Sequence, residues 1–452
     1  MNTKYNDVVI GFGKGGKTIA GALGSSGRKV ALIEKSDKMY GGTCINVGCI
    51  PTKSLVHSAK KAVSGCVSDK AAYKEAIARK TRLVETLRGK NYQKLDMNPN
   101  VTVINGTAGF LSTNEVEVTT AEGTLTVEAE RFFINTGSSP FIPPIKGIDG
   151  NPYVYISETL LDLDVLPERL VIIGGGYIGV EFSSIYADFG VKVTILQDGP
   201  VFLPREDAEI AEAVKKNLEK RGVQVLTEVK VQELTENKGY AEVIIETKEG
   251  MKILPADAVL VATGRRPNTK GLNLEAAGVQ VNERGGIKTD NSRMTTAPNI
   301  FAMGDVVGGL QFTYISLDDY RIVASKVLGD GSYTLDKRGA VPYSVFLNPP
   351  FSRVGMSEKE AVAAGFHVKI AKLPAAAIPK AQVVEQPEGL LKAVIDADTG
   401  KILGAHLFCE ESHEMINLVK LAMDAGIEYT MLKNMIFTHP TMGEALNDLF
   451  NI

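Results

Sequence analysis

Two glycine-rich segments with the same spacing constrain the fold of this chain more than any other feature. Residues 11–16 (GFGKGG) and 174–179 (GGGYIG) both match the pattern G-x-G-x-x-G, and each follows a short apolar run. A helical stretch and a second apolar run come next in both places. This order is typical of a strand, a tight turn and a helix that bind the pyrophosphate of a dinucleotide. The sequence therefore predicts two dinucleotide-binding units in one chain.

Each glycine of the pattern in the first segment has a separate structural role. Gly11 permits the turn, Gly13 lets the backbone approach a pyrophosphate, and Gly16 lets the helix pack on the strand. Glu34 ends the second apolar run, where a carboxylate can accept hydrogen bonds from ribose hydroxyls. A glycine-rich connector would explain the glycines but not the acid that ends the next strand. We therefore predict a dinucleotide site over residues 11–34.

The second unit differs from the first at the position that contacts the ribose. Gln197 stands there instead of an acid, Asp198 follows it, and no arginine lies nearby before Arg205. An acid at this position favours NADH and an arginine favours NADPH, so Gln197 by itself decides neither. We expect NADH or NADPH as the exchanging coenzyme and favour NADH. The turn residues expected to approach it are Gly174, Gly176 and Gly179.

Two cysteines lie five residues apart in the segment 41–54 (GGTCINVGCIPTKS). Pro51 follows Cys49 by two residues, and proline is favoured in the first turn of a helix, so we expect Cys49 to open a helix. A helix N-terminus stabilises an anion and lowers the pKa of a thiol placed there. A thiol of lowered pKa with Cys44 as a nearby partner is typical of a catalytic disulfide. The alternative interpretation is that both cysteines are buried apolar residues. Because the loop after Glu34 leads directly into the pair, FAD, whose ring can pass electron pairs to a disulfide, fits the first site.

Composition limits the class of protein and its partners. A chain of 452 residues is too long for one core and suggests two to four domains. A net charge of −3 gives no reason to expect nucleic acid or an anionic membrane as partner. Four cysteines do not form a disulfide framework in a chain of this length, and no apolar run approaches a membrane span. We therefore expect a cytoplasmic protein, in which a disulfide is usually redox-active.

The rest of the chain alternates between strand and helix patterns. Residues 70–94 combine basic residues with apolar ones at helical spacing, which predicts an amphipathic helix with a solvated basic face. Alternating valines between residues 101 and 127 predict a small β-meander. A strand over 300–305, which ends in Gly304-Asp305, and a helix over 310–327 follow the second unit. From about residue 340 the mixture of β-branched runs and helices predicts a separate α+β domain, with a helix over 415–425.

At this point the chain resembles the flavoprotein disulfide reductases, such as glutathione reductase, lipoamide dehydrogenase and mercuric reductase, over essentially its whole length. The residues that carry the resemblance are both glycine segments, residues 41–53 (GGTCINVGCIPTK), 263–265 (TGR), 303–305 (MGD), and His439-Pro440-Thr441 with Glu444. Within the family, residues 310–321 (LQFTYISLDDYR) and 341–346 (VPYSVF) most resemble the bacterial reactive-chlorine resistance flavoproteins. That group is associated with NAD(P)H-dependent reduction of copper(II) and defence against hypochlorous acid.

The resemblance implies an α/β fold with two Rossmann-like dinucleotide-binding domains, for FAD and NAD(P), and a C-terminal α+β dimerisation domain. It places the first segment of the FAD-binding domain at 1–148, the NAD(P)-binding domain at 149–264, the second FAD segment at 265–338 and the dimerisation domain at 339–452. It also implies a homodimer, because the C-terminal histidine of this family reaches the cysteines of the other subunit.

The resemblance also assigns roles to individual residues. Cys49 would be the sulfur nearest the flavin and Cys44 the one that exchanges with substrate. Lys53 would sit near the flavin and pair with Glu181, although the two could be a simple structural ion pair. His439, oriented by Glu444, would be the acid and base for the exchanging thiol, the alternative being a capping or core histidine. The cofactor-binding residues would be Gly11, Gly13, Gly16, Glu34, Lys53, Thr136, Gly137, Gly304 and Asp305 for FAD, and Gly174, Gly176, Tyr177, Gly179, Gln197 and Gly264 for NAD(P)H, with Tyr177 covering the nicotinamide pocket.

The electron acceptor is expected to be a small molecule or a metal ion. Reduced Cys44 and Cys49 would make a soft site that favours Cu(I), so copper is the metal expected there. Two alternatives stay open: a reductase of a small disulfide such as glutathione or lipoamide, and a redox sensor that binds FAD without turnover. The chain ends in Asn451-Ile452 without a cysteine pair, which disfavours mercuric and thioredoxin reduction.

The remaining histidines and cysteines have simpler interpretations. We expect His57 to be structural, and Cys66 and Cys409 to be ordinary apolar cysteines. His406 and His413 lie near Cys409, but the stretch lacks a strong metal-ligand pattern.

Overall fold

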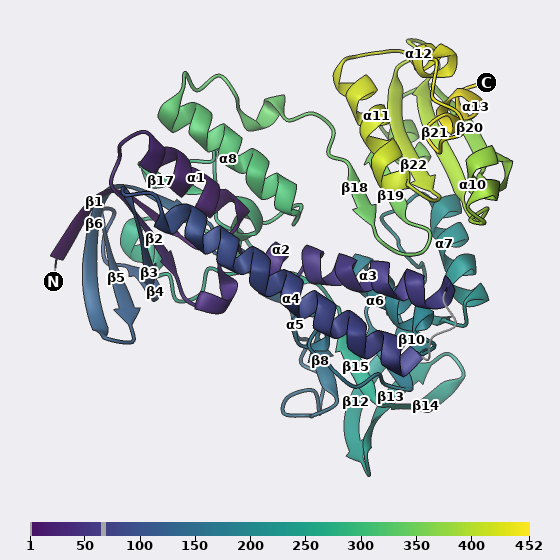
Figure 1. Ribbon diagram of the computed structural model, residues 1–452, viewed down its shortest axis with the longest axis horizontal. Helices are drawn as coiled ribbons and strands as arrows, with labels where there is room; N and C mark the ends of the chain where they lie inside the picture. Colours follow the sequence, from purple (N-terminus) through teal and green to yellow (C-terminus); the bar gives the residue numbers. More distant parts are fainter. Residues whose placement is uncertain (1, 65–68) are drawn as a thin grey trace. The chain divides into compact units, whose positions relative to one another are not determined.

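The computed structural model describes residues 2–64 and 69–452, which divide into two compact units (Figure 1). Unit 1 comprises residues 1–54, 77–141 and 264–338, and unit 2 comprises residues 55–76, 142–263 and 339–452. The helices α3 (Cys49–Ser64) and α4 (Asp69–Asp96) contribute residues to both. The α/β architecture implied by the resemblance is confirmed, whereas the four predicted domain segments stay a prediction.

Unit 1 is built on a seven-stranded sheet in the order β3-β2-β1-β6-β5-β4, with β17 also pairing β6. The parallel strands are β1 (Asn2–Ile10), β2 (Val30–Glu34), β3 (Val101–Asn105), β6 (Gly123–Ile134) and β17 (Ile300–Ala302). The antiparallel strands that extend the sheet are β4 (Thr107–Phe110) and β5 (Glu115–Thr120). A separate antiparallel pair is β7 (Ser138–Pro140) with β16 (Arg265–Pro267). The further helices are α1 (Lys14–Ser25), α2 (Thr43–Asn46) and α8 (Thr313–Leu328).

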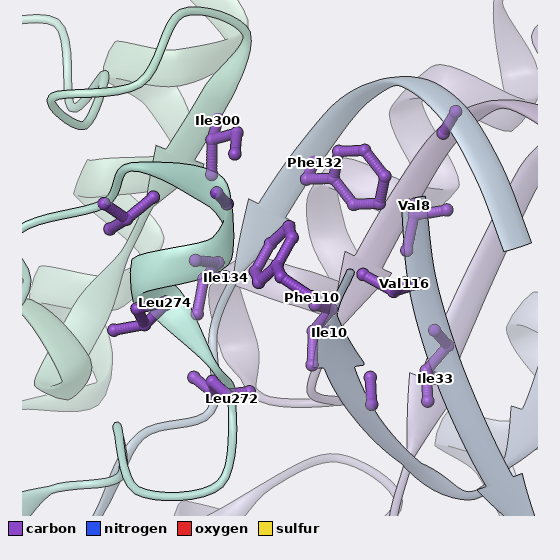
Figure 2. Packing of buried hydrophobic residues seen from close by; sticks show 14 of the residues in the cluster. Val8, Ile10, Ile33, Phe110, Val116, Phe132, Ile134, Leu272, Leu274 and Ile300 are labelled. Carbon is purple, nitrogen blue, oxygen red and sulfur yellow. The ribbon is translucent and has the colours of Figure 1, made fainter. Parts of the chain in front are cut away.

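Both faces of this sheet are buried, as expected for parallel strands covered on two sides. Side chains alternate along a strand, so Val8 and Ile10 point to one face and Val9 to the other. On the first face, shown in Figure 2, Phe110 and Phe132 pack edge to face with ring centroids 5.3 Å apart. On the second face, Val9 is clustered with Phe12 of the glycine turn and with Ile19 and Leu23 of α1. This packing fixes the carboxyl end of β1, where the first glycine turn begins.

The first half of unit 2 contains a parallel sheet in the order β11-β10-β9-β15-β8. Its strands are β8 (Val154–Ile156), β9 (Arg169–Ile173), β10 (Lys192–Leu196), β11 (Gln224–Leu226) and β15 (Ala258–Val261). The helices of this part are α5 (Ser157–Leu160), α6 (Tyr177–Asp188) and α7 (Ala208–Lys220). A three-stranded antiparallel sheet, which the sequence did not predict, consists of β12 (Lys230–Asn237), β13 (Tyr240–Thr247) and β14 (Gly250–Ala256).

The C-terminal part of unit 2 is the α+β arrangement that the sequence predicted. Five antiparallel strands pair in the order β18-β19-β22-β21-β20. They are β18 (Tyr343–Val345), β19 (Phe351–Gly355), β20 (Val368–Pro374), β21 (Leu390–Asp396) and β22 (Ile402–Phe408). The helices are α9 (Glu358–Ala363), α10 (Pro379–Val383), α11 (Ser412–Asp424), α12 (Tyr429–Asn434) and α13 (Ala445–Leu449).

The meander predicted between residues 101 and 127 is wrong in its first strand. Val101–Asn105 pairs in parallel with β2, in the register Val30↔Val101, and so belongs to the nucleotide-binding sheet. The long helix α4 lies between β2 and β3 in the chain and supplies the crossover that parallel strands need. The other strands, β4, β5 and the first half of β6, form the predicted antiparallel ladder.

Two predicted helices differ in detail from those observed. The helix expected over 310–327 begins at Thr313, because Gly308 and Gly309 have positive φ and Phe312 is still extended. The basic helix expected over 70–94 is α4, and its apolar residue Tyr73 is fully buried. Its basic face is not wholly solvated, however, since Lys80 is only 4% exposed.

His406 is a buried titratable group in the C-terminal sheet. It lies on β22 with no exposed surface, and its Nε2 is 3.1 Å from the carbonyl oxygen of Met356. Burial, helped by the charge of Arg353, lowers the pKa of His406 to about 4. The unfolded chain would protonate this histidine near its ordinary pKa of about 6.5, so protonation favours unfolding between these two values.

We expect the free energy of unfolding to fall as the pH drops from about 6.5 to 4, with His406 contributing up to roughly 3 kcal/mol. Urea unfolding at several pH values, followed by circular dichroism, measures this contribution as the difference between the unaltered protein and His406→Gln. Glutamine keeps a hydrogen-bonding side chain but does not titrate. Identical pH slopes for the two proteins would contradict the assignment.

Candidate active site

The first glycine turn is held by Asn135, a residue at the end of β6 that the sequence analysis did not single out. Gly11 has φ +106°, and a Cβ there would lie 2.3 Å from the carbonyl oxygen of Asn135. A Cβ on Gly13 would lie 2.6 Å from Asn135 Oδ1. That oxygen accepts a hydrogen bond of 2.8 Å from the backbone N–H of Gly16. The turn therefore leaves bare backbone at the N-terminus of α1, where an anionic pyrophosphate is stabilised.

Glu34 lies at the end of β2, beside this turn. Its Oε2 accepts a hydrogen bond of 2.9 Å from the N–H of Phe12, and its Oε1 accepts one of 3.3 Å from Ser36. Burial raises the pKa of Glu34, while these backbone donors counter the shift. The carboxylate is thus fixed in orientation and keeps acceptor capacity, while its predicted contact with a ribose stays a prediction.

Asp305 and the turn Thr136–Gly137 lie together in unit 1. Ser138 Oγ donates a hydrogen bond of 2.7 Å to Asp305, and burial raises the pKa of this carboxyl. Arg265 binds Ser138 twice, donating to its Oγ at 2.9 Å and to its carbonyl oxygen at 2.7 Å. The neighbouring Gly304 donates its N–H to the carboxylate of Asp319 at 2.8 Å. Two predicted FAD-binding segments, distant in sequence, are therefore brought together.

The two cysteines are in contact with each other. Cys44 lies on α2 and Cys49 opens α3, as predicted from Pro51. A hydrogen bond from one thiol to the other, together with burial, raises the pKa of Cys44. The hydrogen bond places the two thiols side by side, an arrangement suited to a pair that alternates between two thiols and a disulfide.

Thr313, the first residue of α8, completes this thiol site. Its Oγ1 lies 3.7 Å from Cys49 Sγ, and a hydrogen bond from it lowers the pKa of Cys44, against the larger opposing effects. Sequence reasoning missed Thr313 because it lies far along the chain from both cysteines. The one available signal was its place at the start of a helix whose N-terminus favours a nearby thiolate.

Asn46 fixes the loop that carries Cys44. Its Nδ2 donates to the carbonyl oxygens of Tyr40 and Gly42 at 3.0 and 2.9 Å, and its Oδ1 accepts from Arg88 Nε at 2.8 Å. Nearby, Lys17 Nζ donates to Asn91 Oδ1 at 2.5 Å. Burial lowers the pKa of Lys17 to about 8. The helices α1 and α4 thus supply cationic side chains around the cysteine loop.

The second glycine turn repeats the geometry of the first. Gly174 N donates to the carbonyl of Leu196 at 2.9 Å, as Gly11 N donates to Ile33 at 2.8 Å. Gln197 Oε1 accepts from Gly175 N at 3.1 Å, which is the contact that Glu34 makes with Phe12. Gln197 therefore occupies the position that the sequence assigned to it, with an amide in place of a carboxylate. Its Nε2 donates to Asp198 Oδ1 at 2.9 Å.

Lys53 and Glu181 fall in different units. Lys53 lies on α3 near the end of the segment 1–54, and Glu181 lies on α6 in unit 2. Glu181 Oε1 accepts a hydrogen bond of 2.8 Å from the N–H of Phe346. The predicted pairing of the two side chains stays a prediction. Gly264, expected at the coenzyme site, belongs to unit 1 and accepts a hydrogen bond from Phe141 N through its carbonyl oxygen.

His439 is oriented by Glu444, as predicted. The distance from His439 Nδ1 to Glu444 Oε2 is 2.8 Å, and Glu444 Oε1 accepts a hydrogen bond from Thr441 N at 3.2 Å. The histidine side chain is 69% exposed and the glutamate side chain 17%. An exposed imidazole held by a fixed carboxylate suits a proton acceptor and donor rather than a core histidine.

The other candidate residues are arranged as follows. His57 is exposed on α3, and Cys409 is fully buried with its sulfur 3.9 Å from that of Met415. Cys66 lies outside the described residues. Within residues 2–64 and 69–452, no group of three or more histidine, cysteine or acidic side chains is arranged to hold a metal ion.

Two glycine turns, a cysteine pair that opens a helix and a carboxylate-held histidine define a class of nicotinamide-dependent flavoprotein, and the comparison with known families agrees. The chain belongs to the pyridine nucleotide-disulphide oxidoreductase family, which residues 5–319 match, and residues 341–450 match the dimerisation domain of that family. Enzymes of this family use FAD and NAD(P)H. The bare glycine turn and Glu34 fit FAD at the first site, and the second turn fits the coenzyme.

Particular relatives extend the similarity over the whole chain. The probable pyridine nucleotide-disulfide oxidoreductase RclA of Escherichia coli is 50% identical over 449 residues, covering 99% of both chains. The mercuric reductase of Staphylococcus aureus is 32% identical over 453 residues, covering 98% of this chain and 81% of that protein. A solved Cu(II) complex of the HOCl-induced flavoprotein disulfide reductase RclA superimposes with a TM-score of 0.94 at 50% identity, covering 99% of each chain.

In the part of the chain that the structure describes, no helix combines the length and the apolar character needed to cross a membrane.

We predict that Gly13→Ala lowers the affinity for FAD by about tenfold or more, because the new methyl group would collide with Asn135 and occupy the pyrophosphate approach. The visible flavin absorption per purified chain, before and after added FAD, measures this loss. Gly21→Ala, on the same helix, is the matched control, since its Cβ would meet Leu95 at an ordinary 3.4 Å. Full flavin content in Gly13→Ala would contradict the placement of the pyrophosphate.

Proposed function

We propose that this protein is an NAD(P)H-dependent flavoprotein oxidoreductase in which Cys44 and Cys49 form a redox-active disulfide. The contact between the two thiols and Thr313 is the single observation that carries the proposal. The acceptor is Cu(II) or a related oxidant, and the setting is defence against reactive chlorine or other oxidative stress. The similarity to RclA, a protein described as HOCl-induced and solved with Cu(II), supports this choice.

Different residues of this chain have separate roles in the proposed reaction. FAD, when bound, supplies a ring that takes hydride from NAD(P)H and passes an electron pair to the disulfide. The N-terminus of α3 stabilises the thiolate of Cys49, and the hydroxyl of Thr313 solvates the sulfurs. Cys44 then presents its sulfur to the acceptor. Oxidation of the two thiols back to a disulfide releases two electrons, which convert two Cu(II) ions to Cu(I). Thiolate is a soft ligand that favours Cu(I), so binding assists reduction.

We propose that the protein acts as a homodimer in which His439 serves the cysteines of the other subunit. The match of residues 341–450 to a dimerisation domain supports this arrangement. Large apolar side chains in the same part of the chain are exposed and suited to an interface: Leu421 at 66%, Met431 at 58% and Ile436 at 95%. With Glu444 holding its Nδ1, His439 would take the proton from the exchanging thiol and return it.

Reduction kinetics with a panel of acceptors test the proposed acceptor class. NADH and NADPH are each tried against Cu(II), glutathione disulfide and lipoamide, with Cu(I) detected by a chelator that colours on binding. We expect turnover with Cu(II). Rapid turnover with a small disulfide and none with Cu(II) would instead favour the conventional disulfide reductase, a class that includes the dihydrolipoyl dehydrogenases to which this chain is also similar.

We predict that Cys44→Ser and Cys49→Ser each lower NAD(P)H-dependent Cu(II) reduction by about a hundredfold or more, because serine cannot form the disulfide. Cys409→Ala is the matched control, since this cysteine is buried away from the pair and should leave turnover within about twofold. Rates of Cu(I) formation in the purified, flavin-loaded variants measure the effect. Full activity in either serine variant would contradict the proposal.

We predict that two inactive variants complement each other when their subunits are mixed. In a Cys49→Ser/His439→Gln heterodimer, one of the two sites receives intact cysteines from one subunit and an intact histidine from the other. Co-expression with two affinity tags isolates that heterodimer, and we expect about half of the activity of the unaltered dimer. A heterodimer as inactive as its parents would show that His439 does not act across an interface.

A further inference from the structure

A buried carboxylate in unit 2 holds the tyrosine that follows the second glycine turn. The side chain of Glu206 has no exposed surface. Its Oε1 lies 2.5 Å from the hydroxyl of Tyr177 and 2.7 Å from the hydroxyl of Tyr343, and its Oε2 lies 2.9 Å from the same Tyr343 hydroxyl. Arg353 Nη1 is 3.6 Å from Oε2.

A count of protons shows how these groups share hydrogen bonds. Each tyrosine has one O–H to donate, and an ionised carboxylate only accepts. Burial is the first cause that raises the pKa of both tyrosines, so both stay protonated donors. Tyr177 donates to Oε1 of Glu206, and the hydroxyl of Tyr343 lies within hydrogen-bond distance of both carboxylate oxygens, so one carboxylate can accept from both tyrosines. The two hydroxyls are 3.1 Å apart. Bonds to a charged acceptor are stronger than bonds between neutral groups.

Glu206, Tyr177, Tyr343 and Arg353 form one cluster, and the position of Tyr177 connects it to the coenzyme site. Tyr177 is the first residue of α6, directly after the glycine turn that would receive the pyrophosphate of NAD(P)H. Its ring contacts the ring of Tyr343 on β18 with centroids 5.4 Å apart. Tyr343 and Arg353 belong to the C-terminal sheet, so that sheet supplies two of the groups that surround Glu206.

We infer that Glu206 is a positioning residue for Tyr177: its carboxylate holds the ring where the structure shows it, and NAD(P)H must break this hydrogen bond to bind. The inference rests on the proposed function, in which Tyr177 covers the nicotinamide pocket. Part of the binding free energy of the coenzyme then offsets the lost hydrogen bond, so the observed affinity is lower than the pocket alone would give. Tyr343 can donate to Oε2, so its hydroxyl does not need the oxygen that Tyr177 uses.

A purely structural role for the cluster makes a different prediction. If Glu206 only joined β18 to the coenzyme-binding part of unit 2, removing any one hydroxyl would loosen the site in the same direction. If Glu206 holds Tyr177, the two hydroxyls have different effects. Tyr177→Phe removes the hydrogen bond while keeping the ring, whereas Tyr343→Phe leaves the hydrogen bond from Tyr177 to Glu206 in place.

The experiment measures the dissociation constant of 1,4,5,6-tetrahydro-NADH, an analogue that cannot donate hydride, by calorimetry on the flavin-loaded protein. We expect Tyr177→Phe to bind about fivefold to tenfold more tightly than the unaltered protein, and Tyr343→Phe to bind no more tightly. In a Glu206→Gln background, which weakens the acceptor, the effect of Tyr177→Phe should shrink to about twofold. The KM for NADH should follow the same order.

Three results would overturn the inference. These are unchanged or weaker binding in Tyr177→Phe, equal tightening in both phenylalanine variants, and a full Tyr177→Phe effect in the Glu206→Gln background. The proposed function fails in a distinguishable way: the unaltered, flavin-loaded protein would then bind no analogue at all, and the inference would fall with it.

Discussion

The side-chain amide of Asn135 is the interaction on which the first nucleotide site depends. Its oxygen accepts from Gly16 N in the turn before α1, and its nitrogen donates to the carbonyl of Met303 at 2.6 Å and to Ser316 Oγ at 3.2 Å. Ser316 Oγ in turn accepts from Gly15 N at 3.1 Å. One amide thus joins the ends of β6 and β17, the glycine turn and the helix α8. Since the group is buried, each lost bond would leave an unsatisfied polar atom.

The same network positions the thiol chemistry. Ser316 and Thr313 lie one turn apart on α8, so the contacts that fix the helix against the glycine turn also fix Thr313 beside Cys49. The predicted flavin site and the thiol pair are therefore connected by one network of contacts within unit 1. In unit 2, the amide of Gln197 repeats the role of Glu34, which shows that the turn needs an acceptor at this position but not a charge.

Local pattern was sufficient to predict the elements that carry the site. The glycine spacing gave both strand–turn–helix units, and Pro51 gave the helix start at Cys49, because each depends on residues close in sequence. The parallel pairing of Val101–Asn105, and the roles of Asn135, Thr313 and Glu206, were not predictable in this way. These depend on contacts between residues far apart in the chain, which periodicity and turn chemistry do not encode. His439 with Glu444 was predictable, since five residues separate them.

The three-segment construction of unit 1 has a consequence for synthesis. The strand β17 and the helix α8, which supply Met303, Ser316 and Thr313, are translated after the whole of the 142–263 segment. The parallel sheet of unit 2, spanning β8 to β15, is complete in the nascent chain before them. Domains generally fold as their residues emerge from the ribosome. The first glycine turn therefore cannot make its contacts with β17 and α8 until those later elements have been synthesised. The elements that form and support the expected FAD site, namely the first glycine turn, β17 and α8, are therefore all present only after residue 328 has been added.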